Sequence, residues 1–410
     1  MRVLSYLLTT SLLVYSSIAM SKTSNSSNSS NSSNSSLRIA TFNVSMEALN
    51  YLPAALGKAQ KPTGHELAVA LAENHQQIKN IAEIIQRVNP DIILLNEFDG
   101  NDPKHQSLKR FLSNYLAKSQ QGNTAVNYPY FYQGPSNTGV ASGDDLNNDN
   151  KVGELPNDAY GYGLYSGHFA MALLSKYPIV EEKIRTFQLF KWRDMPNALI
   201  PVNPDSKTPW YNEQAWSNFR LSSKSHWDIP LNVNGNELHI LASHPTPPVF
   251  DGPEDRNGKR NFDEIRFWTD YLTPSAASYI YDDNKHFGGL AQDKAFVILG
   301  DLNADAIEGS AIKSGIERLI NHPRVIDAKP SSEGGKLQRN NNANARYHTA
   351  FWGMRADYVL PAKAQFNLLG SGIFWPKENE AEFRLIKNRA ASSDHRLVWV
   401  DLAFKNPINK

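Results

Sequence analysis

Apolar residues gather in short runs along the chain, separated by long polar stretches. Residues 37–44 (LRIATFNV) are mostly apolar, and a second such run spans residues 91–98. Between them, isoleucines and a valine recur at the spacing of one helix face from Ile78 to Val88, and Asn89-Pro90 ends that pattern. The first hundred residues therefore predict the order strand, helix, strand.

Five later runs have the length and composition of strands, and segments rich in Gly, Pro and Asn separate them. They lie at residues 168–175, 237–243, 295–299, 357–360 and 395–404. The sequence contains no repeat of fixed period and no second linker. We therefore predict one α/β domain with long loops over residues 37–410.

The first twenty residues have the pattern of a secretory signal peptide. Arg2 precedes an apolar stretch from Leu4 to Tyr15 and a region of small residues, so cleavage is expected near residues 19–21. An uncleaved anchor is the alternative, although this stretch is shorter than the roughly 20 residues that a membrane span needs. We expect a signal peptide over residues 1–20, no transmembrane segment, and a secreted or periplasmic protein.

Residues 21–36 are almost entirely Asn and Ser. This composition cannot bury apolar surface, so the segment is predicted to be a flexible linker.

Composition narrows the classes of function. Lys and Arg number 42 against 41 Asp and Glu, a formal charge of +1, so no overall basic field attracts nucleic acid or an anionic membrane. Nucleic acid stays open as a partner only through a local site. The chain has no cysteine, which excludes disulfides and makes a bound metal ion one way to stabilise an exported fold. No feature indicates a protein partner, and a monomer is expected.

Polar residues with catalytic chemistry stand where the predicted strands meet loops. Such ends gather on one rim of a layered α/β fold, which is the usual place for a site. Each position alone is typical of an ordinary solvated turn, but five together indicate a site. These positions are Asn43, Asn96-Glu97, Ser243-His244, Gly300-Asp301-Leu302-Asn303 and Ser393-Asp394-His395.

Six motifs in this order resemble the endonuclease/exonuclease/phosphatase superfamily. They are Thr41-Phe42-Asn43, Asn96-Glu97, Ser243-His244, Gly300 to Asn303, Arg355 to Leu360 and Ser393 to His395. Gly-Asp-x-Asn together with a C-terminal Ser-Asp-His is a specific pair, and the resemblance covers residues 37–404. It implies a four-layer α/β/β/α sandwich with two packed mixed β-sheets, and metal-dependent hydrolysis of phosphate esters.

The resemblance also implies a role for each matched residue. Glu97 and Asp394 match metal-binding carboxylates, and such hard oxygen ligands suit Mg²⁺ or Mn²⁺. His395 would act as base or phosphate stabiliser, with Asp357 orienting its imidazole. Water would attack the phosphate in line, without a covalent enzyme intermediate. The residues expected to contact this water, the phosphate or the metal carboxylate are Asn43, His244, Asp301 and Asn303.

Two positions depart from the family pattern. Asn96 stands where many members have Gln, which leaves the ligand Glu97 in place. Pro245-Thr246-Pro247-Pro248 follows His244, whereas the abasic-site nucleases have an asparagine in this segment. The second departure argues against abasic-site activity in particular.

The charged segment from Asp251 to Arg266 follows His244 closely. Arginine can grip a phosphate or a leaving group through a charge-assisted hydrogen bond, and we predict such a substrate contact for Arg260. The other charges of the segment are expected to be solvated, on an exposed helix over residues 261–272.

Asp145, Asn147 and Asp149 alternate as in the opening of a calcium-binding loop, and Asp158 could complete the ligand shell. No Glu stands at the twelfth position, which is Pro156, so the loop is not an EF-hand. Structural Ca²⁺ and an acidic surface turn are equal alternatives here.

The leading hypothesis is an exported metal-dependent phosphohydrolase, with a nuclease-like phosphodiesterase first. A nuclease lacks the expected basic stripe, and a sphingomyelinase would need an exposed apolar hairpin that the sequence does not reveal. Sphingomyelinase or phospholipase-C-like activity and phosphomonoesterase activity remain alternatives on the same scaffold. A non-catalytic surface interaction module would leave gaps among the matched residues, and there are none.

Overall fold

Eleven strands of the described chain form two mixed β-sheets. The first sheet has the order β10-β11-β1-β2-β4-β3 and the second the order β5-β6-β7-β8-β9. Within these sheets β1 and β2 are parallel, as are β7 and β8, and the other pairs are antiparallel. The bounds are β1 Leu37–Met46, β2 Ile92–Phe98, β3 Tyr130–Tyr132, β4 Met171–Ser175, β5 Arg185–Thr186, β6 His226–Val233, β7 Asn236–Ser243, β8 Ala295–Asp301, β9 Asp357–Pro361, β10 Phe366–Ile373 and β11 Val398–Phe404.

This computed structural model describes residues 36–52 and 61–405. The signal peptide expected over residues 1–20 and the linker expected over 21–36 therefore lie outside the described residues, apart from Ser36. No helix in the described ranges is long and apolar enough to cross a membrane.

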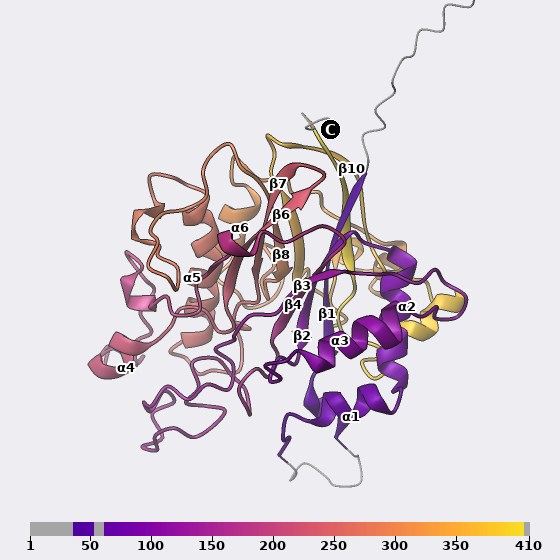
Figure 1. Ribbon diagram of the computed structural model, residues 1–410. Helices are drawn as coiled ribbons and strands as arrows, with labels where there is room; N and C mark the ends of the chain where they lie inside the picture. The colour runs from indigo at the N-terminus through magenta and orange to yellow at the C-terminus, as the bar shows by residue number, and fades with distance from the viewer. Residues whose placement is uncertain (1–35, 53–60, 406–410) are drawn as a thin grey trace, which may run out of the picture. The chain divides into compact units, whose positions relative to one another are not determined.

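The two sheets pack face to face, and helices cover their outer faces (Figure 1). Strand β8 contacts both β1 and β2 across the interface. Helices α1, α2 and α3 lie outside the first sheet, and α5 and α6 lie outside the second (Figure 1). The expected four-layer arrangement is thus confirmed. The helices are α1 Glu66–Ala72, α2 Gln76–Val88, α3 Gln106–Phe111, α4 Glu213–Asn218, α5 Arg256–Tyr271, α6 Ser314–Ile320 and α7 Glu333–Gln338.

Burial on both faces explains why the central strands are apolar runs. Every residue of β8 is buried, and in β1 every residue except Arg38 is buried. Helix α2 packs its isoleucines onto the core and ends where Asn89 takes the left-handed conformation, directly before Pro90. The predicted helix from Ile78 to Val88 and the strands before and after it, β1 and β2, are therefore confirmed.

The apolar pattern misses β3, β5, β6 and β10. Strand β6 contains Pro230, a residue that normally argues against an interior strand because it lacks an N–H donor. The Pro230 carbonyl accepts from Val180 N, so this residue points its backbone groups away from β7 and the hairpin loses no bond. Asn234 and Gly235, both with positive φ, form the tight turn that joins β6 to β7.

The expectation for α5 is wrong in one respect. The helix begins at Arg256 and its polar residues Asn261, Asp263 and Glu264 are buried, not solvated. Long loops lie over this helix, and their backbone amides need partners. Asp263 Oδ2, for example, accepts hydrogen bonds from Trp192 Nε1 and Leu199 N, each at 2.7 Å.

Candidate active site

The strand register brings the predicted polar residues to one rim of the two sheets. In the first sheet Asn43 of β1 stands beside Asn96 of β2. In the second sheet Asp301 ends β8 and pairs with Asp357, which begins the antiparallel strand β9. The carboxyl ends of β1, β2 and β8 therefore meet the amino end of β9.

Left-handed backbone turns occur at this rim. Ser45, Glu97 and Asn303 have φ angles of 46°, 54° and 52°, a region that residues other than glycine rarely adopt. The pairing of β1 with β2 also shifts register between Asn43 and Met46. These turns end the ladders at the site and redirect the side chains that follow each strand.

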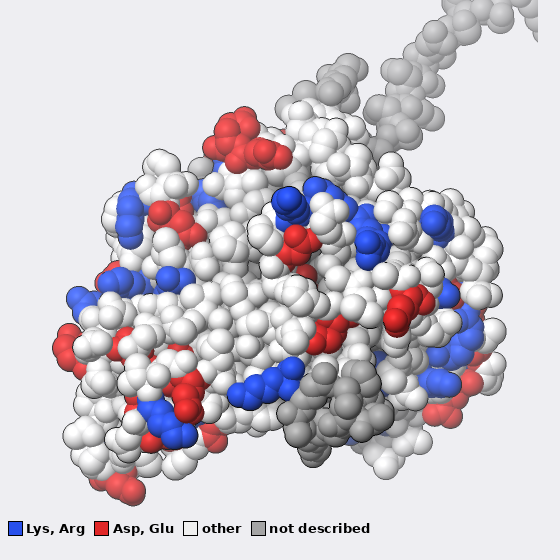
Figure 2. Space-filling view, turned by 60° about the horizontal axis from the view of Figure 1, so that its bottom comes forward, with Lys and Arg blue, Asp and Glu red and all other residues white. Residues whose placement is uncertain are grey.

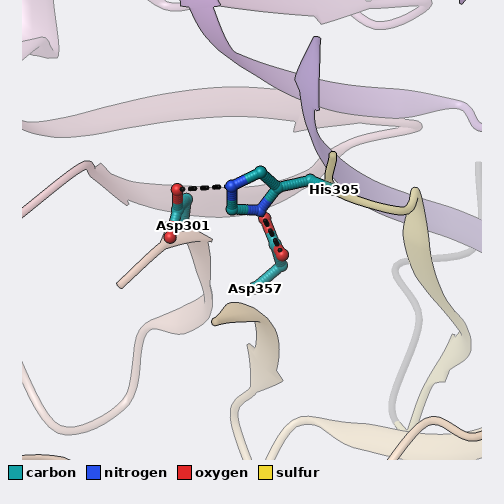
Figure 3. A group of neighbouring side chains, drawn as sticks. All are labelled: Asp301, Asp357 and His395. Atoms are coloured by element: carbon teal, nitrogen blue, oxygen red, sulfur yellow. Dashed lines mark hydrogen bonds and ion pairs between the residues drawn. The ribbon is translucent and has the colours of Figure 1, made fainter. Parts of the chain in front are cut away.

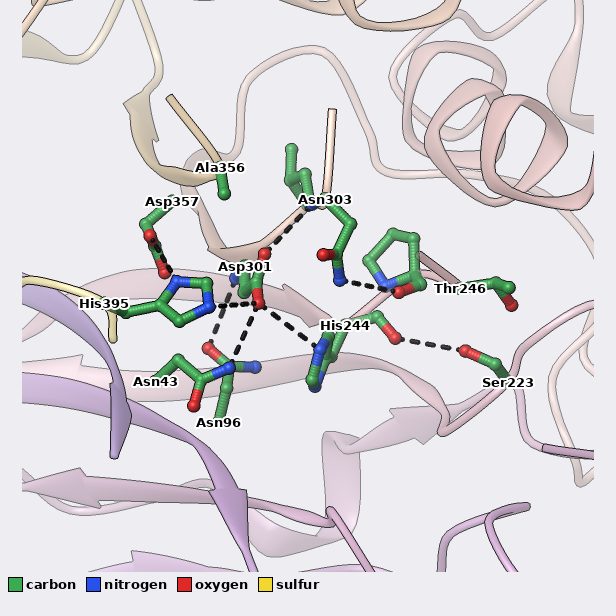
Figure 4. Close-up of polar contacts among 12 residues, drawn as sticks. Asn43, Asn96, Ser223, His244, Thr246, Asp301, Asn303, Ala356, Asp357 and His395 are labelled. Atoms are coloured by element: carbon green, nitrogen blue, oxygen red, sulfur yellow. Dashed lines mark hydrogen bonds and ion pairs between the residues drawn. The ribbon is translucent and has the colours of Figure 1, made fainter. Parts of the chain in front are cut away.

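Asp301 lies at the centre of the site, as Figure 4 shows. Asn43 Nδ2 donates to Asp301 Oδ2 at 3.1 Å. The Nε2 atoms of His244 and His395 each lie 3.5 Å from the same oxygen. The backbone N–H of Asn303 donates to the other oxygen, Oδ1, at 3.0 Å. One buried carboxylate thus gathers four of the residues that the sequence predicted.

His395 stands between two carboxylates (Figure 3). Its Nδ1 lies 2.9 Å from Asp357 Oδ2, and its Nε2 faces Asp301. Burial lowers the pKa of His395, but the charges of Asp357 and Asp301 more than offset this and raise it. Burial raises the pKa of Asp301, although the His395 charge opposes the shift. The ring of Trp352 packs edge-on against the imidazole, with the ring centres 4.8 Å apart.

His244 has a different environment. Burial lowers its pKa well below the usual value, and the charges of Lys224 and His395 act in the same direction. The imidazole is therefore neutral, and its Nδ1 has no hydrogen-bond partner among the described residues. Its backbone carbonyl accepts from Ser223 Oγ at 3.2 Å, which ties the end of β7 to the loop before β6.

Glu97, Asp394 and Glu47 form a second group of acids near the rim. Glu97 is half-buried, and burial raises the pKa of its carboxyl, with the nearby charges of Asp394 and Glu47 reinforcing the shift. Asp394 accepts from Ser45 Oγ at 3.3 Å and keeps part of its side chain exposed. Carboxylates held together in this way repel one another, and a divalent cation would remove the repulsion.

Two groups could therefore hold a metal ion. Glu97 and Asp394 offer carboxylate oxygens that a hard cation prefers. The ligand atoms of Asp301, Asp357 and His395 also lie within 4.8 Å of one another, all buried. In the second group the ring nitrogens already face carboxylate oxygens, an arrangement that suits proton transfer.

A cavity of about 490 Å³ opens next to Glu97 and His244. Its walls come from the loop over residues 146–162, from the segment before β6 and from the start of α5. Aromatic side chains form much of the wall. They are Tyr162, Phe169, Tyr211, Phe219 and Phe250.

Arg260 of α5 also lines this cavity. Its guanidinium is buried and donates to the backbone carbonyls of Leu221, at 2.8 Å, and Arg220, at 3.0 Å. Most of its donors therefore hold the cavity wall together. A substrate contact by Arg260 stays a prediction.

The acidic loop folds back on its own backbone. Asp145 accepts from Asp149 N and Asn150 N, at 3.3 and 2.8 Å, and Asn147 Nδ2 donates to Asp149 Oδ2 at 3.0 Å. Asp158 is bonded to the backbone of this loop, since its oxygens accept from Leu146 N at 2.9 Å and from Glu154 N at 3.0 Å. Asn147 lines the cavity, which places the loop beside the site.

Sequence reasoning missed three residues near the site. Glu47 is fully buried, with Oε2 3.0 Å from His168 Nε2 and Oε1 without a hydrogen-bond partner in the described chain. Thr349 donates to Asp357, and Lys224 lines the cavity. Thr349 and Lys224 follow no apolar run. Glu47 directly follows β1 and stands four residues after Asn43, so it alone carried a signal in the sequence.

A buried aspartate between two histidines, beside carboxylates suited to a divalent cation, defines a metal-dependent hydrolase of phosphate esters. The chain belongs to the Endonuclease/Exonuclease/phosphatase family, whose family model matches residues 40–395. The resemblance in the sequence is thereby confirmed.

Several solved structures are similar over most of the chain. An endonuclease/exonuclease/phosphatase from Beutenbergia cavernae is 16% identical, with a TM-score of 0.49, over 90% of this chain and 72% of that one. The human Nocturnin catalytic domain with bound sulfate is 14% identical, with a TM-score of 0.45, over 90% and 94%. Truncated Caenorhabditis elegans TDP2 is 14% identical, with a TM-score of 0.41, over 90% and 97%. No curated protein matches the chain.

Proposed function

We propose that the protein is an exported phosphodiesterase that cleaves its substrate by in-line attack of water. The observation that carries this proposal is the position of Asp301, which faces both histidines and Asn43 through one oxygen. A carboxylate so placed can orient a water molecule and accept its proton. Export rests on the signal-peptide pattern of residues 1–20.

Glu97 and Asp394 are the residues that would hold the metal ion, Mg²⁺ or Mn²⁺. When bound, such a cation neutralises phosphate charge and polarises the reacting ester. The two carboxylates fit this assignment because both are partly accessible and the charge of Asp394 acts on Glu97. Asp394 also forms an ion pair with Arg389, with 3.6 Å between Oδ2 and Nη1. The buried cluster around His395 then serves proton transfer.

The remaining side chains have complementary roles in this proposal. Asp357 orients His395 through Nδ1, and the other ring nitrogen, Nε2, would donate a hydrogen bond to a phosphoryl oxygen. Neutral His244 and the amide of Asn303 contact the phosphate from the other side. Asn303 Nδ2 donates to Pro245 O at 3.2 Å, which leaves its Oδ1 to orient the water.

A second candidate is a phospholipase-C-like or sphingomyelinase activity. Phe250, with 89% of its surface exposed, and the neighbouring Val249 stand beside the cavity and could contact an apolar substrate. On the face drawn in Figure 2, Lys and Arg are scattered among Asp and Glu without a continuous basic stripe. A duplex nucleic acid would need such a stripe. Because the chain is nearly neutral and this face carries no stripe, a small diester is favoured over a long polymer.

The proposed function is tested with purified protein on bis(p-nitrophenyl) phosphate, p-nitrophenyl phosphate, DNA, RNA and sphingomyelin. Each assay is run with Mg²⁺, with Mn²⁺ and with excess EDTA, and Asp301→Asn is the matched inactive control. We expect metal-dependent cleavage of diesters that exceeds cleavage of the monoester. Turnover that resists EDTA, or that Asp301→Asn retains in full, would contradict the proposal. Sequencing the N-terminus of protein recovered outside the cytoplasm tests export.

A further inference from the structure

Lys224 is a buried lysine in the wall of the active-site cavity. Only 6% of its surface is exposed, and it lines the same cavity as Glu97 and His244. Lysine is almost never buried without a partner, because removing an ammonium ion from water is costly. A buried lysine at this place therefore requires an explanation.

The Lys224 side chain has no partner within the described part of the chain. Its Nζ makes no hydrogen bond or ion pair there, and the only recorded bond of the residue runs from Asn137 N to its backbone carbonyl, at 2.8 Å. The surrounding charges are those of three acids, Glu264, Glu97 and Asp301, and of one base, Arg260. Glu97 and Asp301 belong to the proposed catalytic machinery.

Glu264 does not neutralise Lys224 by direct contact. Its Oε1 accepts from Ser223 N and its Oε2 from Thr246 N, both at 2.6 Å. Glu264 therefore uses both oxygens to hold the backbone on either side of the cavity. The ammonium group is left to face the cavity.

Several hydrogen bonds hold the backbone around Lys224. Ser223 Oγ donates to the His244 carbonyl, and Asn137 Nδ2 donates to Ser222 O at 2.8 Å. His226, two residues further on, is held between Ser222 Oγ and the Glu264 carbonyl. Several hydrogen bonds therefore fix the segment that carries Lys224 next to His244 (Ser223 and His244 in Figure 4).

We propose that Lys224 is a phosphate-binding residue of this site, and that its ammonium group contacts a non-bridging oxygen of the phosphate that is cleaved. This inference rests on the proposed function. Arg260 lines the same cavity, but its Nε and Nη2 donate to backbone carbonyls. The charge of Lys224 makes the cavity selective for an anionic phosphate ester over a neutral ester of the same shape.

The test uses Lys224→Met, which keeps most of the length of the side chain and removes the charge. The matched control is Lys259→Met, because Lys259 is on α5 near the cavity and its Nζ donates to the Glu254 carbonyl. Binding of inorganic phosphate is measured by calorimetry with Mg²⁺ present, together with Mg²⁺ binding, thermal melting, and kcat and KM on the best diester.

We expect Lys224→Met to weaken phosphate binding at least tenfold, in line with the loss of a charged hydrogen bond. We expect kcat/KM to fall about 100-fold, as for removal of one donor to a reacting oxygen. Mg²⁺ affinity should stay within twofold of the wild type, and the melting temperature should not fall, because an unpaired buried charge is removed. Lys224→Arg should recover part of the phosphate affinity.

Wild-type phosphate affinity in folded Lys224→Met would overturn the inference, as would an equal loss in Lys259→Met. If Lys224→Met does not fold, reductive ¹³C-methylation of wild-type lysines gives a second measurement, with the Lys224 resonance assigned through Lys224→Arg. Phosphate must shift that resonance, and an unshifted signal at saturation overturns the inference. Phosphate binding that needs Lys224 in a protein without esterase activity would instead contradict only the proposed function.

Discussion

Thr349 Oγ1 donates a hydrogen bond of 2.7 Å to Asp357 Oδ2, the oxygen that also faces His395 Nδ1. The same hydroxyl accepts from Ala356 N at 2.9 Å and from Asp357 N at 3.0 Å. Its one proton and both lone pairs are therefore used. A residue outside every motif of the sequence thus fixes the carboxylate that orients the histidine.

Thr349→Val should lower both stability and activity. The substitution keeps the shape but leaves two backbone N–H groups and one carboxylate oxygen without this partner, which costs about 1–3 kcal/mol. We expect kcat to fall about tenfold, because the Asp357 carboxylate loses its fixed position while His395 remains. Urea unfolding and steady-state kinetics measure the two effects. Thr208→Val, at an exposed threonine, should change neither quantity.

His395→Ala and Asp357→Asn should differ in severity. Loss of the imidazole removes the donor to the phosphoryl oxygen, and we expect a fall in kcat of about 100- to 10,000-fold. Asp357→Asn retains the imidazole and should cost less. Rates on bis(p-nitrophenyl) phosphate, with thermal melts to exclude misfolding, decide the order. Equal rates for Asp357→Asn and the wild type would contradict the proposal that Asp357 orients His395.

Glu97→Gln should abolish metal-dependent turnover with little change in fold. The substitution is isosteric but removes the charge of the proposed metal ligand, so Mg²⁺ binding should weaken about 10- to 100-fold. Calorimetric titration with Mg²⁺ measures this directly. Glu181→Gln, at an exposed glutamate, is the matched control. If Glu97→Gln retains wild-type turnover at saturating Mg²⁺, Glu97 is not a metal ligand.

Acid should destabilise the fold through His226. This histidine donates from Nε2 to the Glu264 carbonyl and accepts at Nδ1 from Ser222 Oγ, so it is held neutral. Burial lowers its pKa from 6.5 to about 4. Below pH 6.5 this histidine binds a proton in the unfolded chain but not in the folded chain, so stability falls as the pH decreases toward 4.

The free energy of unfolding should fall by about 3 kcal/mol between pH 6.5 and pH 4 because of His226. This figure is the size of the pKa shift multiplied by the free energy of one pKa unit. Urea unfolding of the wild type and of His226→Gln at about pH 7 and about pH 4.5 measures it. The variant should be less stable at neutral pH but should lose less between the two conditions. An identical loss in both proteins would assign the acid sensitivity to other groups.

Calcium should raise the melting temperature through the acidic loop. Asp145 and Asp149 form a turn that needs no ion to close, yet they offer carboxylate oxygens at suitable alternation. An ion that binds only the folded state adds about 2.7 kcal/mol at a hundredfold excess over Kd. Asp145→Ala with Asp149→Ala should erase this rise.

Turnover of the same double variant in Mg²⁺ is a separate readout, because Asn147 lines the cavity. Unchanged turnover at low temperature would leave the loop a purely stabilising role. A wild-type melting temperature indifferent to Ca²⁺ would identify the loop as an acidic surface turn.

The central strands could be predicted from the sequence because burial on both faces makes each an apolar run, as in β1, β2 and β8. Edge and near-edge strands could not. Strand β10 exposes Leu368 and Leu369, and β6 contains Pro230, so neither has the composition of a buried strand. Strand β6 pairs with β7 across a tight turn, and β10 pairs with the next strand, β11, so the missing signal is one of composition.

The residues of the rim could be predicted because they follow apolar runs and match motifs. Glu264 and Lys224 could not, since a buried polar residue on a helix or in a loop has the same local sequence as a solvated one. Glu264 is buried only because Ser223 N and Thr246 N, from two distant segments, both donate to it. Such long-range contacts leave no local pattern.

The left-handed backbone of Glu97 sets a limit on how stable this protein can become. A non-glycine residue in that conformation costs about 1–2 kcal/mol, and glycine would adopt it freely. Selection for stability alone would therefore favour glycine at position 97 and would erase the proposed metal ligand. The carboxylate persists only where catalysis outweighs folding, so directed evolution that screens for thermal tolerance without an activity assay is expected to lose the active site at this position first.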